Sequence, residues 1–261
     1  MDLDGTLLTG DKRISPWSES VLRRAKTAGA RIVLASARPP RSVMPFYTQL
    51  DLDTPMINYN GALVYDPPTQ RVLAHRPIPA AVAGEIVREA RARHPEVIVS
   101  AEILDRWYTD RHDERYLTET ARHCVPDVLA PIDGWLNQPV TKLLLLGEGP
   151  MLTSLRKGFE QTHRHQVAMV QTEGFLLQLM HATTSKAQAL REVAAELGVS
   201  REETLAVGDN ANDVGMLQWA GVSVAVANAC PDALSVADHI TDHHNADGAA
   251  KAVQQWVLHG K

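Results

Sequence analysis

The sequence predicts an α/β protein whose doubly wound, Rossmann-like parallel sheet core is interrupted by an inserted α+β module. Three observations lead to this prediction. The first and last parts of the chain alternate short apolar runs with helical segments, as parallel βαβ units do. The middle part mixes helices with hairpins. Polar groups follow several of the predicted strands at their carboxyl ends, where open α/β sheets place ligands.

The composition is ordinary for a soluble protein with a substantial core. The chain has 261 residues, of which 44% are hydrophobic and 22% are charged, so it could form one large domain or two modest ones. The net charge is −5 without a basic block, so we expect neither nucleic acid nor a membrane as a partner. Cys124 and Cys230 have no metal-site spacing, and no membrane span or signal peptide is recognised, so we expect a cytoplasmic protein.

The first segment, residues 1–78, begins the predicted core. A helix is predicted over residues 16–28, because apolar residues recur there at helical spacing and a glycine follows. A buried strand is predicted over residues 31–35, an apolar run that ends at the hydroxyl residue Ser36. The other elements predicted here are a helix at 41–50, a strand entering a polar turn at 55–62, and a hairpin of 63–65 with 71–73.

The middle segment, residues 79–182, forms the predicted α+β module, with boundaries uncertain by several residues. Its predicted elements are helices at 80–94, 113–123 and 150–162, a strand at 140–146, and hairpins of 97–103 with 106–109 and of 166–170 with 175–180.

The last segment, residues 183–261, returns to strict alternation and completes the predicted core. Its predicted elements are a helix at 184–197, strands at 204–207, 222–227 and 239–241, a helix that opens at 208–213 and runs to residue 220, and helices at 231–237 and 247–257.

The start of the chain is unusual for this fold class. A carboxylate at the tip of a parallel strand needs an apolar strand before it, but only Met1 precedes Asp2. We therefore expect the N-terminus to lie upstream, or the start to be misassigned. An intact mass that matches residues 1–261 of a stable, active protein would contradict this expectation.

The stretch Asp2-Leu3-Asp4-Gly5-Thr6-Leu7-Leu8 carries the strongest chemical signal. On an extended backbone, the side chains of Asp2 and Asp4 point to the same face, and the Gly and Thr that follow let the backbone turn. Paired carboxylates at a strand end suit a hard cation with oxygen ligands, and one of them could act as a nucleophile. Asp-Gly is also a common turn dipeptide, so the stretch alone does not decide the function.

Complementary groups fall where other predicted strands should end on the same edge of the sheet. They are Ser36, Lys186 and the acidic turn with Asp209, Asn212 and Asp213. Acids gathered around one point would repel one another unless a divalent cation holds them. A lysine and a hydroxyl beside them indicate that the second ligand is an anion. The combination predicts a phosphoryl group bound with Mg²⁺.

Structural alternatives exist for each of these groups. Lys186 could be a solvated helix residue, Ser36 a helix N-cap, and Asp209 the cap of a plain strand-to-helix turn. The histidines His239, His243 and His244 could bind a metal, but we favour a solvated loop, because no supporting ligand spacing accompanies them. The sequence has no phosphate-loop or dinucleotide fingerprint.

These stretches together resemble the haloacid dehalogenase (HAD) superfamily. The stretch from Asp2 to Leu8 resembles its first motif, Ser36 lies in a match to the second, Lys186 in a match to the third, and 208–213 resembles the fourth. The stretches 58–62, 227–229 and 247–248 are similar to the Cof-type (HAD-IIB) branch, whose members are mostly sugar-phosphate phosphatases. The matches span residues 2–62 and 185–248, and Ser36 stands where this branch more often has Thr.

The resemblance implies a role for each acidic residue. Asp2 would attack phosphorus and form an aspartyl-phosphate, and Asp4 would serve as the general acid and then the general base. Mg²⁺ would be held by Asp2, the main-chain carbonyl of Asp4, and Asp209, with Asp213 and Asn212 completing the shell through water.

The resemblance also implies a phosphate-binding set and a division of labour between domains. The residues expected to hold the phosphoryl group are Ser36, Ala37, Arg38, Asn60, Lys186 and Asn212. Residues 1–78 with 183–261 would form the catalytic core, and residues 79–182 a cap that closes over the site. Candidate cap contacts to the leaving group are Arg106, Trp107, Arg111, His112 and Glu173.

The function predicted from the sequence is therefore a Mg²⁺-dependent phosphomonoester hydrolase for a small phosphorylated metabolite, with a sugar phosphate as the leading substrate. A phosphohexomutase or phosphonate hydrolase on the same scaffold is the alternative within enzymes. A non-catalytic phospholigand sensor is the alternative outside them. The oligomeric state stays open between a monomer and a homodimer.

Overall fold

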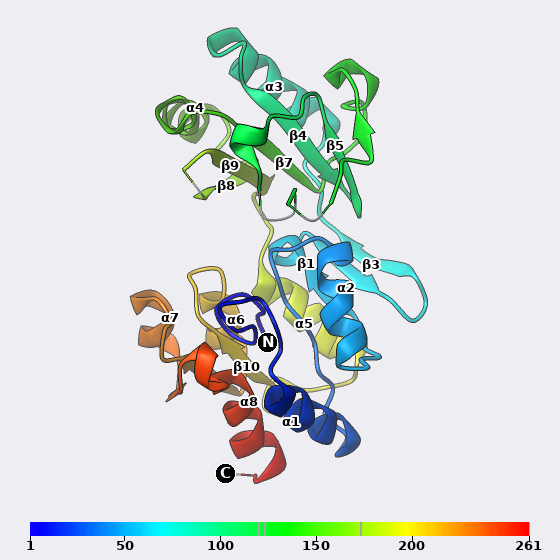
Figure 1. Ribbon diagram of the computed structural model, residues 1–261, viewed down its shortest axis with the longest axis vertical. Coiled ribbons are helices and arrows are strands. Elements are labelled where there is room, and N and C mark those ends of the chain that lie inside the picture. The colour runs from blue at the N-terminus through cyan, green and yellow to red at the C-terminus, as the bar shows by residue number, and fades with distance from the viewer. Residues whose placement is uncertain (119–120, 123, 173, 261) are drawn as a thin grey trace. The chain divides into compact units, whose positions relative to one another are not determined.

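The computed structural model describes residues 1–118, 121–122, 124–172 and 174–260. Two compact units make up the chain (Figure 1): unit 1 is residues 1–74 with 185–261, and unit 2 is residues 75–184. The roles of catalytic core and cap, predicted for residues 1–78 with 183–261 and for residues 79–182, stay a prediction.

The parallel sheet of unit 1 is built on both sides of Met1 and Asp2. On one side, the amide of Asp2 donates to the carbonyl of Val207 at 3.0 Å. On the other side, the amide of Ala35 donates to the carbonyl of Met1 at 2.9 Å, and Ala35 forms a parallel bridge to Ile57. The strands β10 (Leu205–Gly208), β11 (Val222–Val226) and β12 (His239–Thr241) pair in parallel, and β1 (Met56–Asn58) lies beyond residues 31–35. The predicted fold class is confirmed.

The helices of unit 1 begin and end close to the predicted limits. They are α1 (Pro16–Thr27), α2 (Pro40–Gln49), α5 (Lys186–Glu196), α6 (Val214–Trp219), α7 (Pro231–Val236) and α8 (Gly248–Val253), which continues into a π-helical turn (Gln254–Leu258). Ser15 caps α1 by accepting the amide hydrogen of Ser18 at 3.0 Å. The same helix buries Val21 and Leu22, and burial of such side chains contributes about 1.5–3 kcal/mol each.

Two predicted elements of unit 1 differ in detail from the structure. Residues 31–35 are hydrogen-bonded on both sides, yet they carry only the single bridge at Ala35, so the strand is shorter than predicted. The predicted hairpin is present as β2 (Leu63–Asp66) and β3 (Arg71–His75), and it joins β1 in an antiparallel sheet of order β1-β2-β3.

The described residues of unit 2 form one six-stranded sheet and two long helices. The sheet has the order β6-β5-β4-β7-β9-β8. Its strands are β4 (Ile98–Ile103), β5 (Arg106–Thr109), β6 (Val128–Leu129), β7 (Lys142–Leu146), β8 (Val167–Thr172) and β9 (Leu176–His181). The helices α3 (Ala80–Arg93) and α4 (Gly149–Thr162) pack with β4, β7 and β9 in one apolar cluster. Both predicted hairpins are confirmed.

The helix predicted over 113–123 is wrong for its described part. Only a short 3₁₀ helix forms, Glu114–Tyr116, and the backbone of Leu117 leaves the helical region at a ψ of 109°. Asp113 accepts the amide hydrogen of Arg115, which caps the start of this short helix, and it also pairs with the Arg115 guanidinium. Residues 119, 120 and 123 lie outside the described residues.

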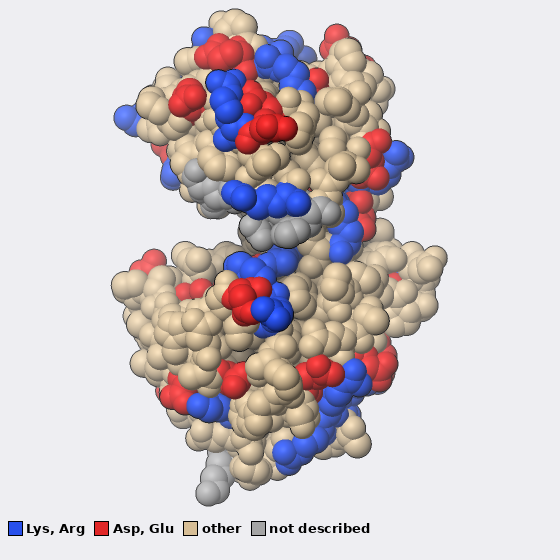
Figure 2. Space-filling view, viewed as in Figure 1, with Lys and Arg blue, Asp and Glu red and all other residues tan. Residues whose placement is uncertain are grey.

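The distribution of charge can be followed on one face of the molecule. Figure 2 shows Lys and Arg side chains interspersed with Asp and Glu side chains over the face in view. Among the described helices, none combines the length and the apolar character that a membrane crossing requires.

Candidate active site

Three carboxylates of unit 1 converge at the carboxyl edge of the parallel sheet. Asp2 continues the short strand that bonds Val207, and Asp209 and Asp213 lie in the turn between β10 and α6. Because neighbouring parallel strands end at the same edge, these side chains meet there. One oxygen of each carboxylate lies within 4.8 Å of an oxygen of the other two. Asp2 is 5% exposed and Asp213 is fully buried.

Lys186 holds two of these carboxylates together. It is the first residue of α5, behind the N-cap Ser185, and it is 1% exposed. Its Nζ donates to Oδ1 of Asp2 at 2.6 Å and to Oδ1 of Asp213 at 2.7 Å. Burial alone would lower the pKa of Lys186, but attraction to the two carboxylates outweighs burial and holds that pKa above its usual range. The alternative of a solvated helix residue is wrong.

The excess negative charge of the carboxylates favours the binding of a cation. Burial raises the pKa of Asp2 to about 7 against the opposing attraction of Lys186, and burial also raises the pKa of Asp209. Three carboxylates face one ammonium group, so a hard divalent ion would offset their excess charge. The donor set therefore fits Mg²⁺. Asp213 also accepts the amide hydrogens of Asp209 at 3.0 Å and of Asn210 at 3.1 Å, which fixes its carboxylate.

Two glycines permit this close packing. Gly5 has a φ of +80°, and a Cβ atom there would lie 2.5 Å from Oδ2 of Asp209. A Cβ atom on Gly208 would lie 2.6 Å from Cβ of Asp213. Any side chain at either position would displace a carboxylate, so both glycines are required by the site.

Asp4 is held by two cations in this structure. Arg38 donates from Nε and Nη2 to its carboxylate at 2.6 Å each, and Lys12 donates from Nζ at 2.7 Å. Burial alone would raise the pKa of Asp4, but these hydrogen bonds outweigh burial and hold it below its usual range. Lys12 was not among the predicted site residues, because its contact depends on the loop that returns it to Asp4.

The other residues of the predicted phosphate-binding set lie nearby in unit 1. Ser36 is buried, and its Oγ accepts the amide hydrogen of Arg38 at 3.1 Å. It stands four residues before the start of α2, so it is not the cap of that helix. The structure brings Asn60 and Asn212 together, since Nδ2 of Asn212 donates to Oδ1 of Asn60 at 2.9 Å. Ala37 is exposed.

Three further residues brace the site, and their roles were not predicted. Thr6 donates from Oγ1 to Oδ1 of Asp209 at 2.7 Å. Asn228 donates from Nδ2 to the carbonyl of Gly5 at 2.8 Å, and its Oδ1 accepts the amide hydrogen of His244 at 2.9 Å. The ring Nδ1 of His244 lies 2.7 Å from the carbonyl oxygen of Leu8. Asn228 entered the sequence prediction only through the family resemblance, and His244 only as one of three clustered histidines.

The other two of those histidines also have neighbours in the fold. The ring of His239 stacks on Trp256 at a centroid distance of 4.7 Å. His243 accepts the amide hydrogen of Asn245 at 3.1 Å. Within the described residues, the group that could hold a metal ion is the cluster of carboxylates, with no histidine in it.

The candidate leaving-group contacts of unit 2 have structural partners of their own. Trp107 donates from Nε1 to Oγ of Ser100 at 2.6 Å. Arg111 donates to the main-chain carbonyls of residues 96 and 97, which ties the segment before β4 to the segment after β5. Arg106 lies 5.5 Å from the ring centroid of Tyr108. His112 is exposed, and Glu173 lies outside the described residues.

Comparison with known proteins gives consistent matches over the whole chain. The model of a family described as haloacid dehalogenase-like hydrolase matches residues 1–253. The 5-amino-6-(5-phospho-D-ribitylamino)uracil phosphatase YitU of Bacillus subtilis is 27% identical, covering 98% of this chain and 96% of its own. The pyridoxal phosphate phosphatase YbhA of Escherichia coli is 28% identical, covering 99% and 97%. A haloacid dehalogenase-like hydrolase from Bacteroides thetaiotaomicron superposes with a TM-score of 0.87 at 27% identity, covering 97% of each chain.

Proposed function

The chain belongs to the haloacid dehalogenase-like hydrolases, and from this premise we propose that it is a Mg²⁺-dependent phosphomonoester hydrolase for a small phosphorylated metabolite. One observation carries the proposal: Asp2, Asp209 and Asp213 converge within 4.8 Å around a buried lysine at the sheet edge. A binding protein for phosphate would not need three converging carboxylates, two of them buried, at the place where its anion binds.

The proposed chemistry assigns a step to each side chain. A carboxylate oxygen of Asp2 attacks phosphorus, the bond from phosphorus to the ester oxygen breaks, and an aspartyl-phosphate forms. Asp4 gives a proton to the departing alkoxide and then takes one from the water that hydrolyses the intermediate. Bound Mg²⁺ supplies positive charge that offsets the carboxylates and the phosphoryl oxygens.

Phosphate binding falls to cationic and polar groups near the acids. Lys186 keeps Asp2 in place and faces the growing negative charge, while Ser36 and the Asn60–Asn212 pair offer hydrogen bonds. Arg38 pairs with Asp4 in the structure. We propose that an arriving phosphoryl group draws Arg38 toward itself, which leaves Asp4 able to carry a proton.

We propose a class of substrate first and a leading candidate within that class second. The two relatives above are named for a phosphorylated ribitylaminouracil and for pyridoxal phosphate, which supports a small phosphorylated metabolite as the substrate. A sugar phosphate remains the leading proposal within that class. We assign leaving-group recognition to unit 2, residues 75–184.

A panel of phosphate esters tests the proposal. Purified protein with Mg²⁺ should release inorganic phosphate from at least one sugar phosphate or related ester. Asp2→Asn should abolish release while the circular dichroism spectrum stays unchanged, and Asp4→Asn should lose most of the activity.

The rival functions give different results in the same assay. A mutase would isomerise a hexose phosphate, need a bisphosphorylated activator, and release no phosphate. A phosphonate hydrolase would release phosphate only from phosphonates. Binding without turnover across the panel would favour the sensor, and appreciable activity in Asp2→Asn would refute the assigned nucleophile.

A further inference from the structure

The turn that follows β1 has a strained backbone. It is a single 3₁₀ turn, Tyr59–Gly61, and it comes directly after Asn58, the last residue of β1. Tyr59 and Asn60 have φ values of +49° and +57°, although neither is a glycine. Residues other than glycine seldom adopt this left-handed region, and two in succession persist only where the surrounding structure holds them. The contacts of the turn therefore show which parts of the site depend on it.

One side of the turn presses on the start of α5. A Cβ atom on Gly61 would lie 2.3 Å from the carbonyl oxygen of Ser185, the residue that caps this helix. Asn60 also accepts a hydrogen bond from Asn212, in the acidic turn of the site. The turn is thus supported by two segments that carry site residues, and it cannot shift toward α5.

The other side of the turn holds the segment 36–38. The amide of Asn60 donates to the carbonyl of Ser36 at 3.0 Å, and the amide of Tyr59 donates to the carbonyl of Arg38 at 3.3 Å. These two bonds fix the direction of the main chain at both ends of the segment. The main chain of two proposed phosphate-binding residues is therefore placed by the turn.

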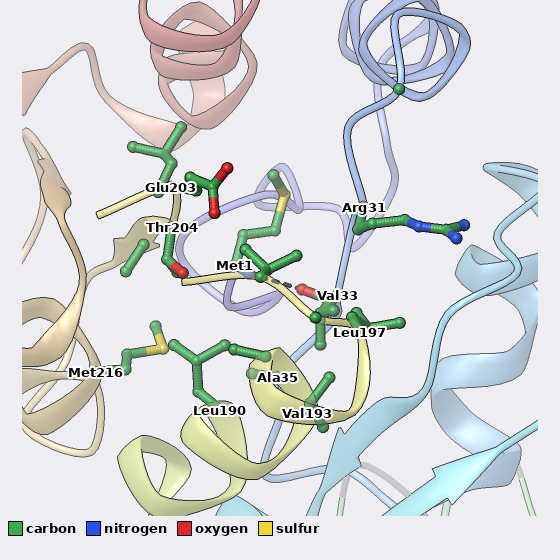
Figure 3. Close-up of a pocket in the computed structure, with 16 residues that line it drawn as sticks. Met1, Arg31, Val33, Ala35, Leu190, Val193, Leu197, Glu203, Thr204 and Met216 are labelled. Carbon is green, nitrogen blue, oxygen red and sulfur yellow. Dashed lines mark hydrogen bonds between the residues drawn. The ribbon is translucent and has the colours of Figure 1, made fainter. Parts of the chain in front are cut away.

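The stretch 31–35, which leads into Ser36, is anchored on both of its sides. On one side, the amino group of Met1 donates to the carbonyl of Val33 at 2.7 Å (Figure 3). On the other side, the amide of Ile57 in β1 donates to the stretch at 2.9 Å. The segment that follows is thus attached to a fixed part of the sheet, and its own course depends on the turn.

Asn58 adds a side-chain hydrogen bond to this arrangement. Its Nδ2 donates to the carbonyl of Arg38 at 3.2 Å, the same oxygen that accepts the amide hydrogen of Tyr59. Asn58 is fully buried, and its Oδ1 has no hydrogen-bond partner among the described residues. A buried acceptor without a partner destabilises the folded state, and Tyr59 alone would satisfy the carbonyl of Arg38. Stability alone therefore gives no reason for an amide side chain at this position.

We propose that Asn58 is a positioning residue for Arg38, a role that rests on the proposed function, in which Arg38 turns from Asp4 to the arriving phosphoryl group. The guanidinium of Arg38 is bonded to Asp4 at 2.6 Å, so leaving that partner changes the forces on its own main chain. Two hydrogen bonds on one carbonyl hold that main chain in place during the movement. Loss of the bond from Asn58 loosens it, and phosphate binding weakens.

Phosphate binding tests this role without turnover. Asn58→Ala leaves the position slightly underfilled and Asn58→Leu slightly overfilled, so an effect that both variants share belongs to the lost amide. With Mg²⁺ present, the Kd for inorganic phosphate should rise about tenfold in both variants. The melting temperature should change by less than about 3 °C, because the unpaired Oδ1 is removed together with the hydrogen bond.

A control variant removes a buried hydrogen bond near the other end of β1. Thr54 is buried there, and its Oγ1 donates to the carbonyl of Ile32. Thr54→Val should lower the melting temperature and leave the Kd for phosphate unchanged. The same pattern in the two Asn58 variants would show a purely structural role and would overturn the proposal.

A double variant shows whether Arg38 transmits the effect. In Arg38→Ala, the added Asn58→Ala should raise the Kd for phosphate no further, and additive losses would overturn the proposal. With p-nitrophenyl phosphate, KM should rise about as much as the Kd while kcat changes less than about twofold; a fall in kcat alone would contradict the role. Phosphate binding without turnover in the unsubstituted chain would refute the proposed hydrolase, and the titrations would still decide the role of Asn58. No phosphate binding by that chain would refute both.

Discussion

The buried cluster of Asp2, Asp213 and Lys186 makes folding depend on protonation. Burial raises the pKa of Asp2 from 3.8 to about 7, with Lys186 opposing and the neighbouring acids adding to the effect. The folded state therefore binds this proton more tightly than the unfolded state does. Its contribution to stability is complete below pH 3.8 and is lost as the pH rises through the folded value.

We expect the metal-free protein to lose stability as the pH rises from about 4 to about 6, by on the order of 2 kcal/mol from Asp2. The amino group of Met1 acts with the opposite sign only above that window, because burial lowers its pKa from 8.0 to about 6. Urea unfolding in EDTA at several pH values measures the slope. In Asp2→Asn the slope should be flatter; an unchanged slope would show that other groups cause it.

At the level of single residues, the sequence predicted which residues form the site better than it predicted which side chains contact one another. Asp2, Asp209 and Asp213 meet because parallel strands deliver their ends to one edge, and Lys186 reaches Asp2 and Asp213 from the start of helix α5. Lys12 could not be predicted in the same way. Its contact with Asp4 depends on the conformation of the loop between the two residues, and sequence spacing does not determine that conformation.

Among the elements, the loop from Gly5 to Leu8 depends on a clamp supplied by the last third of the chain. Asn228 links the carbonyl of Gly5 to the amide of His244, and His244 contacts the carbonyl of Leu8. The amide of Cys230 donates to the carbonyl of Asp209 at 2.8 Å, so the segment 228–230 touches both acidic stretches of the site. The clamp therefore joins the two acidic stretches through hydrogen bonds.

Replacing Asn228 should therefore weaken catalysis more than folding. Asn228→Ala leaves the carbonyl of Gly5 and the amide of His244 without that partner, and we expect kcat/KM to fall about tenfold. The Mg²⁺ concentration for half-maximal activity should rise as well, since the loop begins directly after Asp4, whose main-chain carbonyl is a proposed Mg²⁺ ligand. Ser235→Ala removes a similar hydrogen bond on the exposed helix α7 and serves as the control. Equal effects of the two variants would exclude a positioning role.

Helices and strands could be predicted where the residues that favour their ends agree with the spacing of their buried side chains. Helix α1 has a proline at its start, a serine cap and buried residues at helical spacing. The segment 113–123 has apolar and charged residues that suit a helix, but Asp113 folds back onto Arg115 and the backbone turns extended at Leu117. The residue at which a helix ends is set by local backbone geometry that periodicity does not report.

At the scale of the whole molecule, the decisive feature is that the hydrophobic core is divided between the two units. The main apolar cluster of unit 1 includes Leu22, Leu34 and Val207, and that of unit 2 includes Ile86, Leu145 and Phe159. No buried residue belongs to both clusters among the described residues. Each unit therefore has a hydrophobic core of its own, as independently stable domains do.

This division predicts two thermal transitions, of which Mg²⁺ moves only one. The carboxylate cluster lies wholly in unit 1, so Mg²⁺ at about a hundredfold excess over its Kd adds about 2.7 kcal/mol to that unit alone. For a unit of about 150 residues, this is a shift of roughly 5–10 °C. Scanning calorimetry with and without Mg²⁺ measures it, and hydrogen exchange of peptides from β10 and from β7 assigns each transition. Asp209→Asn should lose the shift while both transitions remain. A single transition that shifts as a whole with Mg²⁺ would contradict the prediction, because it would show that the two cores unfold cooperatively. Titration of Asp209→Asn with Mg²⁺ would then test whether the metal binds in unit 1.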